Sequence, residues 1–188
     1  MIKIFIGGSR HVKRLNTVIH DRLNNIISQN FQIVVGDANG ADKVVQQYLS
    51  EHHYRHVLVY CSGQVCRNNI GNWKTVNVVV PKSINGRRFY MAKDLEMAKS
   101  ADYGLMLWDG KSAGTINNIF SLLTLGKKAV LYFSQEKRFY TISTISDIET
   151  VFLKCKKDDL DKIDKKINIT KLKEGIRAST HNEELTLK

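Results

Sequence analysis

The sequence predicts an α/β fold: a Rossmann-like, doubly wound, mostly parallel sheet with helices on both faces, followed by a small C-terminal extension. Three observations predict it. Short apolar runs of strand length alternate along the chain with apolar stripes at helical spacing. Glycine-rich segments follow three of these runs. The alternation is typical of βαβ units, whose right-handed crossovers place helices on both faces of a parallel sheet.

Each predicted strand is a short apolar run, and each predicted helix is a stripe of apolar residues that repeats every three or four positions. The predicted strands cover residues 3–6, 32–35, 57–60, 78–80, 102–108, 128–133 and 138–142. The predicted helices carry their stripes in residues 15–27, 41–49, 90–98, 115–125 and 145–153. Pro81 ends the strand at residues 78–80, and Gly126 stands where the C-cap of the helix before it belongs.

The pattern divides the chain into a Rossmann-like domain, residues 1–135, and a C-terminal extension, residues 136–188. From Lys156 onward charges of both signs dominate, so we expect a docked helix or hairpin and then a frayed end. The 188 residues and their 43% hydrophobic content suffice for one sizeable core.

The composition of the chain argues against a membrane protein, a secreted protein and a zinc protein. No apolar run reaches the roughly 20 residues of a membrane helix, and the N-terminal apolar run has no cleavage-site pattern after it, so we expect no membrane association and no signal peptide. The three cysteines, Cys61, Cys66 and Cys155, lack CxxC spacing, which favours a reduced cytoplasm and argues against a zinc site. We expect no metal and no required cofactor.

The net charge of +11 is compatible with a nucleic acid, with an anionic small ligand or with a generally basic proteome. The basic residues are scattered, and the chain has neither an RNA-recognition aromatic motif nor zinc-finger spacing. Nonspecific nucleic-acid binding stays open as the weaker alternative.

The segment Asp109–Thr115 joins a predicted buried strand directly to a predicted helix through glycines. Such a junction presents free backbone N–H groups and the positive end of the helix dipole, which suit a phosphate. Lys111, Ser112 and Thr115 add a cation and two hydroxyls. A plain strand–turn–helix connection with Thr115 as N-cap stays equally open. A P-loop is excluded, because Leu105 stands where the Walker pattern needs its first glycine.

Two further glycine loops, Gly7–Arg10 and Gly36–Asp42, follow predicted parallel strands. In a doubly wound sheet ligands bind outside the C-terminal ends of the strands, where these loops and the one at Gly110 would meet. We therefore expect a site for a nucleotide or a nucleotide sugar at this edge. Its predicted residues are Gly7, Gly8, Ser9, Arg10, Gly36, Asp37, Gly40, Asp42, Asp109, Gly110, Lys111, Ser112, Gly114 and Thr115.

Several predicted side chains have two interpretations. Arg10 could grip a phosphate bidentately or be a surface arginine. Asp109 could accept hydrogen bonds from ribose hydroxyls or cap its own loop. Asp42 could act in the site, or it could only interact favourably with the dipole of the helix whose first turn it occupies. The long polar stretch of residues 61–77 is too long for a plain connection. Within it a base clamp and the loop's own structure are both open as roles for Arg67, Asn68, Asn69 and Trp73.

Lys93 and Asp94 are predicted on a solvated helix face. The six histidines show no metal spacing, and we assign none of them a role.

Four stretches resemble the SLOG superfamily of Rossmann-like nucleotide-binding domains. They are Gly7-Gly8-Ser9-Arg10, the second glycine loop at residues 35–42, the helix at residues 91–98 and the loop at residues 109–115. The superfamily includes LOG phosphoribohydrolases, DNA-processing DprA proteins and the YspA-type branch, to which this chain is most similar. The resemblance covers roughly residues 1–133 and implies nucleotide binding there; relatives with this architecture pair, so it also implies a homodimer.

The resemblance also implies several chemistries, among them cleavage of an N-glycosidic bond in a nucleotide. LOG hydrolases carry a glutamate three positions after Gly-Thr, and here that position is Asn118. An amide cannot act as a general base. We therefore expect a ligand-binding module, with Asn118 among its binding residues. An N-glycoside hydrolase or transferase that uses Asp37, Asp42 or Asp109 is the alternative, and DprA-like nucleic-acid binding is a weaker one.

Overall fold

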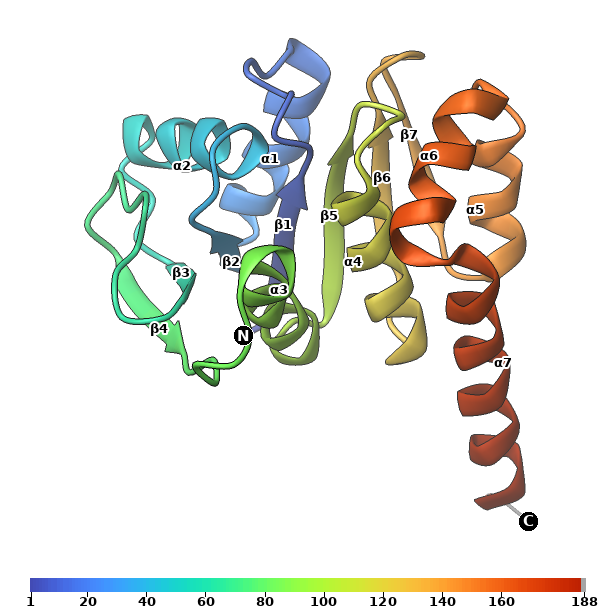
Figure 1. Ribbon diagram of the computed structural model, residues 1–188. Coiled ribbons are helices and arrows are strands. Elements are labelled where there is room, and N and C mark those ends of the chain that lie inside the picture. The colour runs from blue at the N-terminus through green and yellow to red at the C-terminus, as the bar shows by residue number, and fades with distance from the viewer. Residues whose placement is uncertain (187–188) are drawn as a thin grey trace.

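The computed structural model describes residues 1–186, without the side chains of residue 87 and residues 180–186. They form a seven-stranded sheet in the order β4-β3-β2-β1-β5-β6-β7, covered by helices (Figure 1). The strands are β1 (Lys3–Gly8), β2 (Gln32–Gly36), β3 (Val57–Ser62), β4 (Lys74–Val78), β5 (Tyr103–Trp108), β6 (Ala129–Phe133) and β7 (Arg138–Ile142). The helices are α1 (Thr17–Ser28), α2 (Ala41–Glu51), α3 (Gly86–Ser100), α4 (Ala113–Thr124), α5 (Ile145–Phe152), α6 (Lys157–Ile167) and α7 (Ile169–Thr186).

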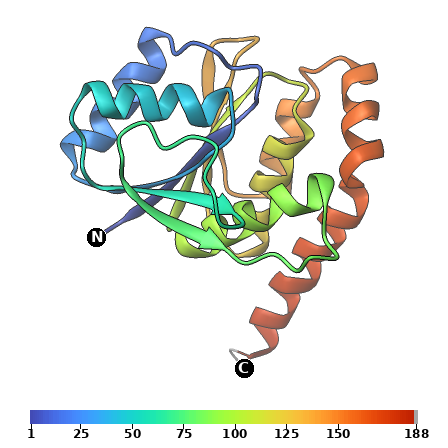
Figure 2. The same cartoon turned by 60° about the vertical axis from the view of Figure 1, so that its left-hand side comes forward.

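The predicted doubly wound fold is confirmed. Strands β1 to β6 pair in parallel, and β7 pairs antiparallel with β6. Successive residues of a strand enter opposite cores, because side chains alternate between the two faces of a sheet. Phe5 and Trp108 pack in the core beneath α3 to α7, whereas Ile6 and Leu107 pack in the core beneath α1 and α2. Figure 2 shows α1 and α2 together on one side of the sheet.

The predicted strand at residues 78–80 is wrong. β4 is Lys74–Val78, and Val79 is 91% exposed. β4 is an edge strand whose polar and apolar residues alternate, because only one of its faces is covered. A continuous apolar run is typical of a strand that is buried on both faces, so the predicted position followed the apolar residues 78–80 and missed the alternating residues of β4. The correction shortens the polar loop before β4 to residues 63–73.

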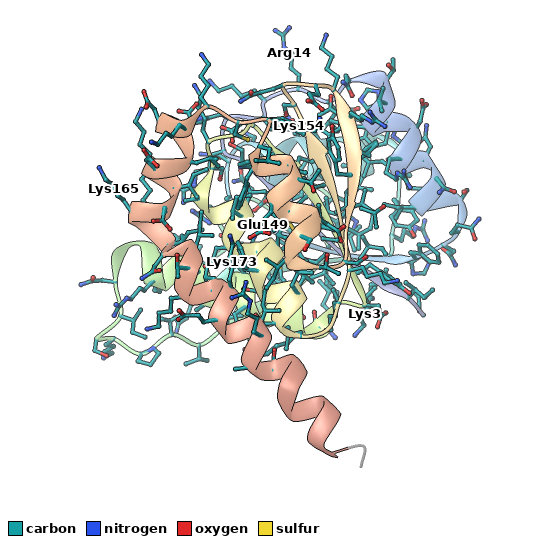
Figure 3. All side chains as sticks on the ribbon, turned by 90° about the vertical axis from the view of Figure 1, so that its right-hand side faces the viewer. Lys3, Arg14, Glu149, Lys154, Lys165 and Lys173 are labelled. Carbon is teal, nitrogen blue, oxygen red and sulfur yellow. A yellow bond between two sulfur atoms is a disulfide. The ribbon has the colours of Figure 1, made fainter. Side chains whose placement is uncertain are left out.

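The C-terminal extension packs on the face of the sheet that carries α4. Ile163 and Ile176 join the same apolar cluster as Phe120 and Trp108. Figure 3 looks onto this side, where Lys173 Nζ of α7 lies 2.6 Å from Glu149 Oε1 of α5. The expected docked helix is thus present as a helical pair, α6 and α7. None of the described helices combines the length and apolar character that a membrane crossing requires.

Candidate functional site

The candidate site lies where the sheet order reverses between β1 and β5. The chain leaves β1 toward α1 on one face and leaves β5 toward α4 on the other, which opens a crevice at the C-terminal ends of these strands. A pocket of about 530 Å³ occupies this crevice. It is lined by Phe5, Gly7, Gly8, Ser9, Arg10, His11, Ala38, Asp42, Arg67, Gly86, Tyr90, Met91, Lys93, Asp94, Met97, Lys111, Ser112, Ala113, Gly114, Asn118 and Lys166.

The three glycine loops meet at this edge. The amide of Ala41 donates to the carbonyl oxygen of Ser9 at 3.0 Å, which joins the first loop to the second. His11 Nδ1 lies 3.1 Å from Asp109 Oδ2, which joins the first loop to the third. The predicted convergence of the loops is therefore present in the structure, and His11, to which the sequence assigned no role, takes part in it.

Two glycines allow the close approach of these loops. A β-carbon at Gly8 would collide with the carbonyl oxygen of Leu107 and lie 2.9 Å from the Ala41 side chain. Gly40 has a φ of +84°, and a β-carbon there would collide with the backbone of Arg10. Any larger residue at either position would push the loops apart, so these glycines serve the architecture of the pocket.

The third loop ends at the N-terminus of α4. Ser112 is the N-cap, and its Oγ accepts from the Thr115 amide at 3.3 Å. The interpretation of Thr115 as the N-cap is therefore wrong, because the helix begins two residues earlier. Asp109 Oδ1 accepts from the amides of Lys111 and Ser112 at 3.1 and 2.8 Å, so its carboxylate holds the turn.

Two amides at this helix end are free. Among the backbone and side-chain groups that the structure describes, the N–H groups of Ala113 and Gly114 donate to no acceptor, and both residues line the pocket. Arg10 and Lys111 stand at the mouth of the same pocket as exposed side chains. Free amides, the helix dipole and two cations together favour an anion at this end.

The buried residues that line the pocket include two apolar side chains and one amide. Phe5 and Met97 are buried there, with exposed fractions of 0% and 1%. Asn118 is 7% exposed, and its side chain makes no hydrogen bond to any part of the chain that the structure describes. Among the described residues the only fully buried side-chain polar atom without a partner is Ser62 Oγ, so the Asn118 amide is open to the pocket and is a candidate ligand contact.

One wall of the pocket carries a buried cluster of charges. Lys93 is 3% exposed, and its Nζ lies 2.7 Å from Asp94 Oδ1 and 3.9 Å from oxygens of both Asp37 and Asp42. Burial would lower the pKa of Lys93, but the three carboxylates raise it above its usual value. The prediction that Lys93 lies on a solvated helix face is wrong, since these carboxylates stabilise it inside the protein.

Two of the three carboxyl groups around Lys93, those of Asp37 and Asp42, differ in pKa. Burial would raise the pKa of Asp37, but the hydrogen bonds that it accepts from Arg67 hold that pKa below its usual value. Asp42 is 7% exposed, and burial raises its pKa to about 6 against the opposing effect of Lys93. Of the three acids predicted as catalytic candidates, Asp42 lines the pocket, whereas Asp37 and Asp109 do not.

The polar loop contributes Arg67 to the pocket. Its guanidinium lies 4.3 Å from the centre of the Tyr90 ring and donates to Asp37 at 2.6 and 3.1 Å. Asn69 pairs with the backbone of Trp73, and the Trp73 indole donates to the carbonyl oxygen of Tyr54 at 2.8 Å. Trp73 therefore anchors the loop and does not line the pocket.

The remaining predicted residues fall into two groups. Gly7, Ser9, Ser112 and Gly114 line the pocket, as do Gly8, Arg10, Lys111 and Asn118. Gly36, Gly40, Gly110 and Thr115 do not line it. Gly36 allows close packing, because a β-carbon there would collide with Asp42 Oδ2 and lie 2.5 Å from Lys93 Nζ.

Sequence reasoning missed most of the α3 wall and the contribution of the C-terminal extension. Tyr90, Lys93, Asp94 and Met97 line the pocket at helical spacing, so the signal was present but was interpreted as a solvated face. Lys166 of α6 also lines the pocket. No local signal could have found it, because it depends on how the extension docks.

Among the described residues, no three His, Cys, Asp or Glu side chains are grouped so as to hold a metal ion. No family model matches the chain, and no curated protein matches it.

One solved structure that aligns with the chain is DNA processing protein A from Helicobacter pylori, described for its single-stranded DNA binding mode. The alignment has a TM-score of 0.47 and 13% identity, and covers 64% of this chain and 61% of that one. A likeness at this level does not bear on what this chain binds.

Proposed function

We propose that the pocket binds a nucleotide or nucleotide-derived ligand and that the protein is a sensor or binding module for it. The observation that carries the proposal is that two free backbone amides, from Ala113 and Gly114, and the unpaired side-chain amide of Asn118 lie on the same helix and line the same pocket. A phosphate would accept from the free amides and from Arg10 or Lys111. An uncharged part of the ligand would reach Asn118.

The spacing along α4 suits such a ligand. Gly114 and Asn118 are four residues apart on one face of the helix, which is about 6 Å along its axis. That is roughly the separation between the 5′-phosphate and the ribose of a nucleotide. The exposed residues that line the pocket include Arg10 and Lys111, and the buried ones include Phe5 and Met97, which suits a phosphate beside the first pair and a ring beside the second. Membership of the SLOG superfamily, suggested by the motifs, is part of the same proposal.

Thermal unfolding with a ligand panel tests the proposal. The panel contains nucleoside monophosphates, NAD, ADP-ribose-type compounds and inorganic phosphate. A ligand at 100 times its Kd stabilises the native state by about 2.7 kcal/mol. Arg10→Ala with Lys111→Ala should remove most of that shift. Lys74→Ala is the matched control, because Lys74 is exposed at the start of β4, at the opposite edge of the sheet. No stabilisation by any nucleotide would contradict the proposal.

A second candidate function is cleavage of an N-glycosidic bond, and Asp42 favours it. An acid with a pKa of about 6 can be present in both protonation states near neutral pH, as a general acid or base requires. Chromatography of each stabilising ligand after incubation separates the two functions. Release of the base, lost in Asp42→Asn, would establish the enzyme. Recovery of every ligand unchanged would favour the binding module over the enzyme. Salt-sensitive oligonucleotide binding without nucleotide binding would favour the nucleic-acid alternative.

A further inference from the structure

Cys61 and Cys66 form a disulfide beside the pocket, with their Cα atoms 5.1 Å apart. Cys61 is buried near the C-terminal end of β3, and the pocket lies at the C-terminal ends of the strands. Cys66 is half-buried in the following loop and directly precedes Arg67. The bond therefore ties the arginine that lines the pocket to a rigid strand.

Arg67 joins this loop to the site. Its amide and guanidinium donate three hydrogen bonds to Asp37, and its guanidinium lies over Tyr90 of α3. Arg67 thus holds the second glycine loop and the α3 wall together. A change in the mobility of Arg67 would therefore affect both the second glycine loop and the α3 wall.

The loop is held firmly on both sides of Cys66. Before it, the amide of Gly63 donates to Val78 at 3.0 Å and Asn77 Nδ2 donates to the carbonyl oxygen of Gln64 at 2.6 Å. After Arg67, the Gln46 side chain accepts from the Ile70 amide at 3.0 Å.

Between these anchors the described structure gives residues 65 and 66 no hydrogen bond, and Val65 is 80% exposed. The disulfide, together with the packing of Cys66 against the apolar core, thus constrains the residues that lead into Arg67.

We propose that Cys61 and Cys66 are a thiol–disulfide exchange site that controls how firmly Arg67 is held at the pocket. The thiolate of a small dithiol attacks the sulfur of the less buried cysteine, Cys66, and the bond to Cys61 breaks. The second dithiol sulfur then displaces Cys66. Two electrons and two protons pass to the cysteines, and the dithiol becomes a cyclic disulfide. A small-molecule disulfide such as oxidised glutathione reverses the reaction by accepting the two electrons.

The effect on ligand binding rests on the proposed nucleotide function, whereas the exchange reaction and its effect on the loop do not. Cys155 stands apart as the free cysteine, and burial raises its pKa to about 11, so its thiol is a poor nucleophile. Cys155→Ser therefore provides a background in which only the pair reacts.

The test uses the full chain carrying Cys155→Ser. After oxidised glutathione, native alkylation followed by mass measurement should find no free thiol; after dithiothreitol it should find two. Amide hydrogen exchange at residues 65–68 should then be about tenfold faster in the reduced form, with β1 unchanged. Cys66→Ser should resemble the reduced form under both conditions.

Three results would overturn the proposal. One is two free thiols after oxidation, because the disulfide would then not form. Another is equal exchange in the two forms. The third is a nucleotide, bound as proposed above, whose affinity is the same in both forms, where we expect a several-fold weakening on reduction. If no nucleotide binds at all, the proposed function fails, and the alkylation and exchange results still decide whether the pair controls the loop.

Discussion

The ammonium nitrogen of Lys93 lies 3.9 Å from a carboxylate oxygen of Asp42, and both side chains are buried in the wall of the pocket. Asp94 and Asp37 face the same ammonium group, at 2.7 and 3.9 Å. Burial opposes ionisation of Asp42 more strongly than Lys93 favours it, so the pKa of Asp42 rises to about 6. The pocket therefore contains an acid that changes its charge just below neutral pH.

Asp42→Asn should change how stability depends on pH. The pKa of Asp42 is about 6 in the folded protein and 3.8 without its surroundings. Between these values the folded state binds the proton more tightly, so the free energy of unfolding falls as pH rises from about 4 to 6, by at most about 3 kcal/mol. Asp42→Asn has no titrating group at this position, so its free energy of unfolding should not show this fall.

Urea unfolding of both proteins from pH 4 to 7 measures the difference. Asp37 has a lowered pKa, so its contribution is lost only below about pH 4 and is common to both proteins. Parallel curves for the two proteins across this range would contradict the pKa assigned to Asp42.

Gly40→Ala should destabilise the protein more than Gly126→Ala does. Both glycines have positive φ, +84° and +67°, so each substitution carries a strain of about 1–2 kcal/mol. At Gly40 the new β-carbon would also collide with the backbone of Arg10, whereas at Gly126 it meets nothing within 4 Å. Denaturant midpoints with equal m-values provide the comparison. Equal losses would mean that the first two glycine loops do not pack as described.

Asn118→Leu should weaken nucleotide binding and leave inorganic phosphate binding unchanged. The substitution keeps the approximate volume of the side chain and removes its amide, which lines the pocket and has no partner among the described residues. Loss of one ligand hydrogen bond corresponds to about tenfold in affinity. Asn117→Leu is the control, because Asn117 is the preceding residue of α4 and does not line the pocket. A tenfold loss for phosphate as well would place Asn118 at the anion end.

The fold could be predicted from the sequence because its strands are apolar runs of the right length. β5 was predicted to within one residue, since a strand buried on both faces is apolar throughout. β4 was missed because an edge strand alternates. The convergence of the glycine loops followed from the rule that parallel strands end at the same edge.

The site was less predictable because its chemistry depends on burial. Lys93 looks like a surface residue until three carboxylates from three different segments surround it. Asp109 looked like a ligand contact, but its carboxylate oxygens accept from two amides of its own turn and pair with His11. Lys166 reaches the pocket through tertiary docking. Asp94 is adjacent to Lys93 in the sequence, but Asp37, Asp42 and the His11 partner of Asp109 are distant from the residues that they contact.

Calorimetric titration of Gly114→Leu with nucleoside monophosphates tests the central claim most directly. A β-carbon at Gly114 would come no closer than 3.9 Å to any side chain, so the variant should fold, but its larger side chain would cover the free amides of α4. Gly175→Leu is the control, because Gly175 has open space in α7 and does not line the pocket. We predict that wild type and Gly175→Leu bind a nucleotide equally and that Gly114→Leu does not bind it. A folded Gly114→Leu that binds nucleotide as wild type does, or a wild type that binds none, would contradict the account.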